Sequence, residues 1–342
     1  MKYIGNKTRI LDFIETSMKK SHIDYHNKKV ADLFAGTGSV SSFFLKNGCN
    51  TYSCDNMTYS ICEQYRTNYY NENPTFEEVE DIVKGSSIDD VLNYLNSLEG
   101  LKGYFFENFA PSGKFQRQYF SDKNAEKIDA ITNCLEDWKK VLPSEKYNYL
   151  NGILMCAADK VSNTSGTYGA YLKIWRSMAL KDLILEKPEI ISNGKNFIFQ
   201  DDVLNFAKNN KEFDIVYLDP PYNKRQYASN FHVLESIVVN DKQDLKGKTG
   251  LRNYENQKSD YCIKNKVLNS FTNLVKNIDT KYIVMSYSTE GLLTEKEISD
   301  VLSTRGEVTI YRNEYRRFKT NAWTDDNTGL QELVFVCKVN IS

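Results

Sequence analysis

The sequence predicts an α/β fold in which a mostly parallel sheet is divided by a long helical insertion. Two observations indicate this. Strand and helix patterns alternate over residues 29–70 and again after residue 196, and such alternation is typical of βαβ units in a parallel, right-handed sheet. The intervening residues instead show helical spacing of apolar side chains. We therefore expect one α/β domain from residues 1–85 and 191–342, with residues 86–190 as a mainly helical insertion.

The individual elements follow from the apolar spacing. Residues 29–34 predict a short buried strand, 39–46 a helix that ends at Gly48, 51–54 a second strand and 61–70 a second helix. Later strand patterns lie at residues 197–199, 214–218, 282–287, 307–311 and 333–338, and later helical patterns at 203–208 and 295–303. Within the insertion, helices are expected at residues 125–140, 147–160 and 175–185.

The composition is that of an ordinary globular protein. Charged residues make up 26% of the 342 residues and apolar residues 41%, a balance that excludes a disordered chain. Lys and Arg (44) nearly equal Asp and Glu (45), so any nucleic-acid-binding surface must be local.

Cysteine usage and hydropathy exclude further classes of protein. The seven cysteines form no C-x-x-C pair and are accompanied by three scattered histidines, so neither a metal site nor a disulfide framework is expected. The N-terminus has no apolar targeting segment, and no uninterrupted apolar run approaches the ~18 residues of a membrane span. We therefore expect a cytoplasmic protein without membrane contact and without metal.

A glycine-rich turn follows the first strand, in the segment Asp32-Leu-Phe-Ala-Gly-Thr-Gly-Ser-Val40. Gly36 and Gly38 allow positive φ and close approach of a ligand to the backbone, at the sheet edge where open α/β folds bind ligands. Asp55 ends the next strand, where an acid commonly holds ribose hydroxyls. Because the third glycine of a dinucleotide fingerprint is missing, an adenosine-type cofactor without pyrophosphate is favoured, and S-adenosylmethionine is the commonest. Asp32 would then receive the positive end of its amino-acid part, whereas a turn that merely needs glycine is the structural alternative.

A second motif ends the strand at residues 214–218, in the sequence Asp219-Pro220-Pro221-Tyr222. The two prolines fix φ and remove two backbone donors, and an ionised Asp219 is an acceptor only. Two acceptors beside a flat aromatic ring suit a planar exocyclic amino group. Hydrogen bonds to Asp219 and to the Pro220 carbonyl would favour a pyramidal nitrogen whose lone pair can attack a methyl sulfonium, while Tyr222 stacks on a base that has left its duplex. The structural alternative is a Pro-Pro turn with an incidental aspartate.

These motifs resemble those of DNA adenine N6-methyltransferases, and in particular those of the Dam-type family. The resemblance rests on the segment at 219–222, on the turn at 32–38 and on an N-terminal Lys-aromatic-x-Gly-x-Lys motif, here Lys2-Tyr3-Ile4-Gly5-Asn6-Lys7. The order of the motifs along the chain also matches, and the interior of residues 86–190 is not covered. The four-residue motif alone is shared with N4-cytosine enzymes and some RNA or protein amino-methylating enzymes, so the order and the N-terminal motif carry the specificity.

The resemblance implies a Rossmann-like, class I S-adenosylmethionine-dependent methyltransferase sheet, with residues 86–190 as the target-recognition domain. It implies catalytic roles for Asp219, Pro220 and Tyr222. The implied cofactor site comprises Tyr3, Lys7, Asp32, Phe34, Gly36, Gly38, Asp55 and Asp219, together with an acid on the strand before the catalytic one.

Two neighbouring residues, Asp201 and Asp202, are the candidates for that acid, which would hydrogen-bond the cofactor adenine. We favour Asp202 because a small apolar residue and a helix follow it. A helix N-cap is the structural alternative for either aspartate, and an exposed lysine at a helix start is the alternative for Lys7.

Basic and aromatic residues that follow the catalytic motif are candidates for DNA contact. Lys224, Arg225 and Tyr227 lie on a loop that could close over a flipped base and grip phosphates, whereas we expect His232 to be structural. Arg316, Arg317 and Lys319, with Trp323, lie between two strand patterns and predict a hairpin with a basic, aromatic tip. In the insertion, the possible contacts are Lys114, Arg117, Lys173 and Arg176.

The predicted function is transfer of a methyl group from S-adenosylmethionine to N6 of a flipped adenine in double-stranded DNA. The resemblance also implies a modification enzyme of a restriction–modification system, with a cognate restriction endonuclease as a possible partner, although a solitary methylase fits equally. We expect a monomer. The alternatives are an N4-cytosine or RNA adenine methyltransferase, and a non-catalytic DNA-binding regulator with a methyltransferase fold. The recognition sequence does not follow from the residues, because direct readout depends on which side chains enter which groove.

Overall fold

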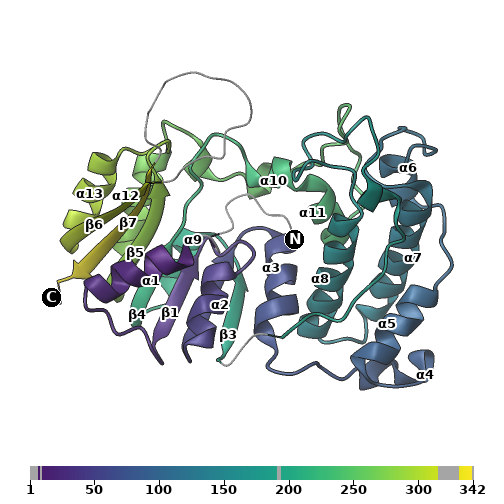
Figure 1. Ribbon diagram of the computed structural model, residues 1–342, viewed down its shortest axis with the longest axis horizontal. Coiled ribbons are helices and arrows are strands. Elements are labelled where there is room, and N and C mark those ends of the chain that lie inside the picture. The colour runs from purple at the N-terminus through teal and green to yellow at the C-terminus, as the bar shows by residue number, and fades with distance from the viewer. Residues whose placement is uncertain (1–6, 8–9, 191–193, 315–330, 341–342) are drawn as a thin grey trace.

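The sheet confirms the predicted α/β fold. The computed structural model describes residues 7, 10–190, 194–314 and 331–340. The strands in this part of the chain are β1 (Lys29–Leu33), β2 (Asn50–Asp55), β3 (Asn196–Gln200), β4 (Phe213–Leu218), β5 (Thr280–Ser288), β6 (Gly306–Glu314) and β7 (Gln331–Val339). They form one sheet in the order β3-β2-β1-β4-β5-β7-β6 (Figure 1). Neighbouring strands are parallel except β7, which runs antiparallel to both β5 and β6.

Helices cover the sheet and form a second lobe beside it (Figure 1). A π-helical turn at Tyr65–Tyr69 continues α3, so the predicted helix at 61–70 is present in two parts. The helices are α1 (Leu11–Lys20), α2 (Ser39–Lys46), α3 (Thr58–Gln64), α4 (Glu80–Val83), α5 (Ile88–Ser97), α6 (Tyr104–Phe109), α7 (Asp122–Trp138), α8 (Ser144–Lys160), α9 (Val203–Asn209), α10 (Tyr227–Asn230), α11 (His232–Val239), α12 (Val267–Asn277) and α13 (Glu295–Ser303).

Alternating side chains of each central strand enter two different cores, as expected of a sheet that is covered on both faces. On one face, Val30 and Val284 pack with apolar residues of α1 and α2. On the other face, Ala31 and Ile283 pack with apolar residues of α9, α12 and α13. This double burial explains why the strands are continuous apolar runs in the sequence.

The second lobe has a core of its own, built from α3 to α8 together with α10 and α11. The buried residues of this core extend along the sequence from Met57 to Val238. The packed helical region therefore extends on both sides of the predicted insertion at residues 86–190, and the division of the chain at those two positions stays a prediction.

The predicted helix at residues 175–185 is wrong. This part of the chain contains a single 3₁₀ turn, Ser177–Leu180, and then runs extended. Two asparagine side chains satisfy the extended backbone: Asn124 bonds Lys181 O and Leu183 N, and Asn96 bonds both backbone groups of Leu185. These tertiary hydrogen bonds replace the helical ones. Leu183 and Leu185, two residues apart on the extended backbone, are both buried.

The buried Glu235 side chain of α11 joins that helix to the start of α3 and carries a prediction for stability. Its carboxylate accepts hydrogen bonds from the first amides of α3, Thr58 N (3.1 Å) and Tyr59 N (2.8 Å), and from Gln257 Nε2 (2.5 Å). Glu235→Ala leaves the buried amide of Tyr59 and the part-buried donors of Thr58 and Gln257 without this acceptor. We therefore expect the free energy of unfolding to fall by about 3 kcal/mol. Urea unfolding would measure this, with Glu72→Gln at an exposed bend as the control; equal stability of the two variants would contradict the prediction.

The strand order reverses direction between β1 and β4, which lie side by side at the centre of the sheet. In open α/β sheets, ligands bind in the crevice outside the carboxyl ends of the strands at such a point. The fold therefore places the glycine turn after β1 and the Asp-Pro-Pro-Tyr segment after β4 next to each other at one edge.

Candidate active site

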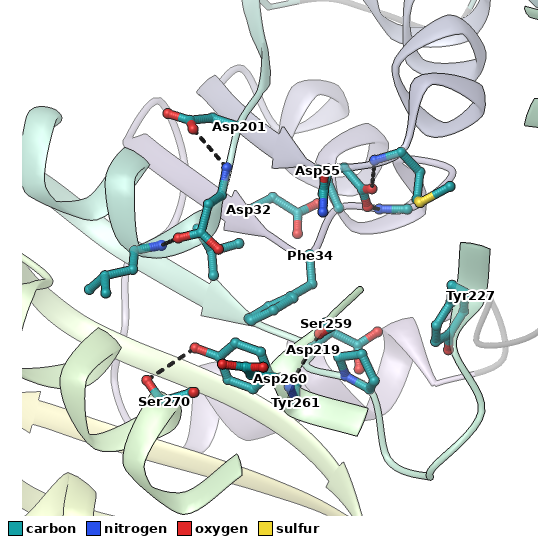
Figure 2. Close-up of a pocket in the computed structure, with 18 of the residues that line it drawn as sticks. Asp32, Phe34, Asp55, Asp201, Asp219, Tyr227, Ser259, Asp260, Tyr261 and Ser270 are labelled. Carbon is teal, nitrogen blue, oxygen red and sulfur yellow. Dashed lines mark hydrogen bonds between the residues drawn. The ribbon is translucent and has the colours of Figure 1, made fainter. Parts of the chain in front are cut away.

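A cavity of about 440 Å³ lies at the carboxyl ends of β1 to β4, within the size range of small-molecule sites. Each of these strands contributes an acid, and Figure 2 shows several of them around one hollow. The predicted residues that line the cavity are Lys7, Asp32, Phe34, Gly36, Asp55, Asp201, Asp202, Asp219 and Tyr227. The structure thus brings together motifs that lie far apart in the sequence.

The glycine turn is held in place by Asp55. Its carboxylate accepts the backbone amides of Gly36 (2.8 Å) and Met57 (2.8 Å). Phe34 adopts a left-handed backbone (φ +67°), as do Gly36 (φ +52°) and Gly38 (φ +73°). A left-handed backbone is unusual for a bulky residue, and here it accompanies a ring that lies at the cavity.

Gly38 is needed for packing and does not line the cavity. A Cβ atom there would lie 2.4 Å from Asn68 Nδ2 and 2.9 Å from Gln64 Cγ. The predicted contact of Gly38 with a cofactor therefore stays a prediction. Its close approach to Gln64 of α3 and to Asn68 is a property of the fold.

The cavity carries a large excess of negative charge. Six aspartates and two lysines line it. Asp32 is fully buried within β1 and accepts a hydrogen bond from Ser41 Oγ (2.6 Å). Burial, and to a lesser extent the neighbouring Asp219, raise the pKa of Asp32 to about 7. Such a site favours a ligand that brings positive charge, and the residues present fit the cationic S-adenosylmethionine.

Two aromatic rings form one wall of the cavity. The rings of Phe34 and Tyr261 meet edge to face with their centroids 4.7 Å apart, and Phe34 lies between Asp32 and Tyr261 in Figure 2. The Tyr261 hydroxyl donates to Ser270 O (3.2 Å), which fixes the ring. Sequence reasoning missed Tyr261, because it lies in a loop with no motif around it.

The Asp-Pro-Pro-Tyr segment meets Lys7 at the edge of the cavity. Lys7 Nζ lies 3.0 Å from Asp219 Oδ1. It also donates to the Tyr222 hydroxyl and lies 4.3 Å from the centre of that ring. Burial opposes the charge of Lys7, but attraction to Asp219 and other neighbours keeps its pKa above the ordinary value. Lys7 is therefore charged, and it occupies the Asp219 carboxylate that the predicted methyl transfer needs as the acceptor for the target amino group.

Ser286 of β5 completes this cluster. Its Oγ donates to Asp219 Oδ1 (3.2 Å) and lies 2.7 Å from the Tyr217 hydroxyl and 3.5 Å from that of Tyr222. The Tyr222 ring also packs against Tyr287, with centroids 4.8 Å apart. The signal by which the sequence could have identified Ser286 is a polar residue directly after the apolar run at residues 282–285 of a buried strand.

The two candidate acids after β3 have different partners. Asp202 is the N-cap of α9, and its Oδ1 accepts Leu204 N (2.9 Å) and Asn205 N (3.3 Å). Asp201 Oδ1 accepts the amide of Asp202 (2.7 Å). Both line the cavity, so the cap and a contact with a ligand are compatible for Asp202.

The candidate DNA contacts fall into four groups. Lys224 and Arg225 are exposed, whereas Tyr227 is a cavity residue on α10. Arg117 is buried and donates to three backbone carbonyls, so its proposed DNA contact is wrong.

His232 is buried and bonds Tyr168 O (2.8 Å), in agreement with a structural role. Tyr3, Arg316, Arg317, Lys319 and Trp323 lie outside the described residues.

The comparisons with known proteins agree with this site. A model of the D12 class N6 adenine-specific DNA methyltransferases matches residues 3–301. The chain is 36% identical over 334 residues to the type II methyltransferase M.NlaIII of Neisseria lactamica, covering 96% of this chain and 95% of that protein. It is 32% identical over 335 residues to the type II methyltransferase M.CviAII of Paramecium bursaria Chlorella virus 1, covering 98% and 97%.

A longer relative matches over part of its length. The chain is 37% identical over 344 residues to the modification methylase StsI of Streptococcus sanguinis, covering 98% of this chain and 51% of that protein. It therefore spans about half the length of StsI. The chain belongs to the D12 class N6 adenine-specific DNA methyltransferase family. The predicted family is thus confirmed.

Two further features are missing from the part of the chain that the structure describes. No helix there is both long and apolar enough to cross a bilayer. No group of three or more His, Cys, Asp or Glu side chains among the described residues could hold a metal ion.

Proposed function

We propose that the protein transfers the methyl group of S-adenosylmethionine to N6 of an adenine that has left double-stranded DNA. The observation that carries this proposal is the cluster of Asp219, Tyr222 and Lys7 at the edge of an acidic cavity. Lys7 shows that this position accepts a nitrogen donor on Asp219 against the Tyr222 ring. The N6 amino group of adenine is another nitrogen donor, attached to a flat ring.

The chain's own residues would divide the work as follows. Asp32 holds the ammonium group of the cofactor and Asp55 its ribose, while Asp202 accepts from its adenine amino group. Phe34 and Tyr261 offer one apolar wall against which the adenine of the cofactor packs. When bound, S-adenosylmethionine supplies an electrophilic methyl group on a positively charged sulfur.

At the target base, Asp219 and the Pro220 carbonyl accept the two N6 hydrogens, and Tyr222 stacks on the ring. These bonds favour a nitrogen whose lone pair forms the new N–C bond as the C–S bond breaks. The excess proton then leaves N6 to water or to Asp219. Lys7 must leave Asp219 before this arrangement forms, because both nitrogens use the same acceptor.

We propose that Lys224, Arg225 and the segment with Arg316, Arg317 and Lys319 contact the DNA backbone. Exposure of Lys224 and Arg225 beside the cavity supports this for the first two. We further propose a cytoplasmic monomer that acts as the modification enzyme of a restriction–modification system, with a cognate endonuclease as partner. The names of its relatives as type II methyltransferases and modification methylases support that role.

Product analysis tests the proposed reaction directly. The protein is incubated with S-adenosylmethionine and unmethylated genomic DNA, and the DNA is digested to nucleosides for mass spectrometry. We expect N6-methyldeoxyadenosine. N4-methyldeoxycytidine would instead identify a cytosine enzyme, methylation of RNA alone an RNA enzyme, and no product on either nucleic acid a non-catalytic binder.

Cofactor binding is expected to depend on pH through Asp32. Because burial raises the pKa of this carboxyl to about 7, it is protonated below pH 7 and ionised above it. The ionised form holds the ammonium group, so affinity for S-adenosylmethionine should rise roughly tenfold from pH 6 to pH 8. Calorimetric titration at several pH values measures this affinity. The Asp32→Asn variant should bind S-adenosylmethionine more weakly, and its affinity should change less with pH. A wild-type affinity that is constant over this range would refute the assignment.

A further inference from the structure

Glu332 is a carboxylate that the proposed reaction does not use. It lies on β7 opposite Ser288 of β5, and Val334 lies opposite Ser286. Residues two apart in a strand share a face, and directly opposite residues of an antiparallel pair also do. Glu332 therefore lies on the same face of the sheet as Ser286, the residue that donates to Asp219.

The Glu332 carboxylate is poorly satisfied where it stands. Its Oε2 atom is buried and has no hydrogen-bond partner among the residues that the structure describes. A buried carboxylate oxygen without a donor is costly and calls for an explanation. Burial raises the pKa of Glu332, whereas the nearby Lys7 opposes this, so the ammonium group lies within electrostatic reach.

Lys7 is the cation that could satisfy it. In the structure its ammonium group lies on Asp219 and over the Tyr222 ring, the two groups that the target adenine needs. A charged, buried lysine cannot simply lose its partner, because an unpaired buried charge is strongly unfavourable. Entry of the base is therefore favoured by a second carboxylate that can take the ammonium group of Lys7.

We propose that Glu332 receives the ammonium group of Lys7 when the target adenine displaces it from Asp219. This inference rests on the proposed function. Before the base enters, Lys7 pairs with Asp219, and Glu332 Oε2 has no donor among the described residues. Afterwards, Lys7 pairs with Glu332 while the adenine amino group donates to Asp219. No charge enters or leaves the cluster, and each carboxylate gains or keeps a partner. Glu332 is thus a positioning residue that acts through Lys7.

The variant Glu332→Gln tests this inference, because it keeps the shape of the side chain and removes its charge. We expect kcat/KM on unmethylated genomic DNA to fall roughly ten- to a hundredfold, the equivalent of one charge-assisted hydrogen bond. Calorimetry should show an unchanged affinity for S-adenosylmethionine, which also reports that the variant is folded. Glu307→Gln on the exposed face of β6 is the matched control and should behave as the wild type.

A double-mutant cycle with Lys7 separates this role from a merely structural one. If Glu332 acts by receiving Lys7, the loss caused by Glu332→Gln should disappear when Lys7→Met is already present. Wild-type kcat/KM in Glu332→Gln would overturn the inference, as would an equal loss in both backgrounds. If the proposed function is wrong, the wild-type protein itself yields no N6-methyldeoxyadenosine. That result would overturn both the proposed function and the role of Glu332.

Discussion

Replacing Asp219 with alanine is expected to lower kcat by on the order of 10³-fold or more while S-adenosylmethionine still binds. Asp219 is the charged acceptor at the end of β4, and nothing else in the described cluster offers a carboxylate at that position. Without it, the target nitrogen keeps its lone pair delocalised in the ring. Methyl transfer to DNA, measured by mass spectrometry under single-turnover conditions, reports the rate, and calorimetry reports cofactor affinity.

Controls are needed because Asp219 also pairs with a buried lysine. Removing one partner of a buried ion pair destabilises a protein, so the inactive variant could be a misfolded one. Asp219→Asn keeps the volume, and Asp219→Ala with Lys7→Met removes both charges together; each should stay folded and inactive. Asp214→Asn, at the other end of the same strand with Lys281 as its partner, should be as active as the wild type. Turnover near the wild-type rate in Asp219→Ala would remove the catalytic assignment.

Replacing Tyr222 with alanine is expected to lower kcat/KM for DNA by about ten- to a hundredfold, because stacking of one base on an aromatic ring contributes ~1–3 kcal/mol. The ring is held by Tyr287, 4.8 Å away, and by the bond from Leu292 N to the Tyr222 carbonyl (2.9 Å). The ring itself is therefore fixed before the base arrives, and only Lys7 has to leave it. Steady-state methylation of genomic DNA measures the effect.

The phenylalanine variant is the matched control for this prediction. Tyr222→Phe keeps the ring and loses the hydroxyl that Lys7 and Ser286 contact. If stacking is the role of Tyr222, this variant should retain most of the activity. Equal losses in Tyr222→Phe and Tyr222→Ala would assign the effect to the hydroxyl and its network instead.

Much of the site could be predicted from the sequence, because its parts are local motifs at strand ends. A buried apolar run followed by Gly36 and Gly38, or by Asp219, predicts both a strand and the sheet edge at which it ends. Parallel strands share that edge, so Asp32, Asp55 and Asp219 were expected to converge. Their common place around one cavity follows from the sheet order.

Other features depended on contacts that no local pattern shows. The segment at residues 175–185 has helical spacing, yet side chains of Asn96 and Asn124 hold part of it extended. Arginine commonly contacts DNA, but the Arg117 side chain donates instead to backbone carbonyls of a loop that is distant in sequence. Tyr261 lines the cavity from a loop without a motif.

The sequence by itself determined the class of fold, the two motifs and the chemistry of an acceptor beside a flat ring. These follow from short-range physics: apolar periodicity, the φ freedom of glycine and the missing donors of proline. Tertiary structure decided that Lys7 pairs with Asp219 and that Ser286 donates to the same carboxylate. It also placed Glu332 on the same face of the sheet, with one oxygen that has no donor in the described part of the chain. Pairing of charges across a fold depends on distance and burial in space, and separation along the chain says nothing of either.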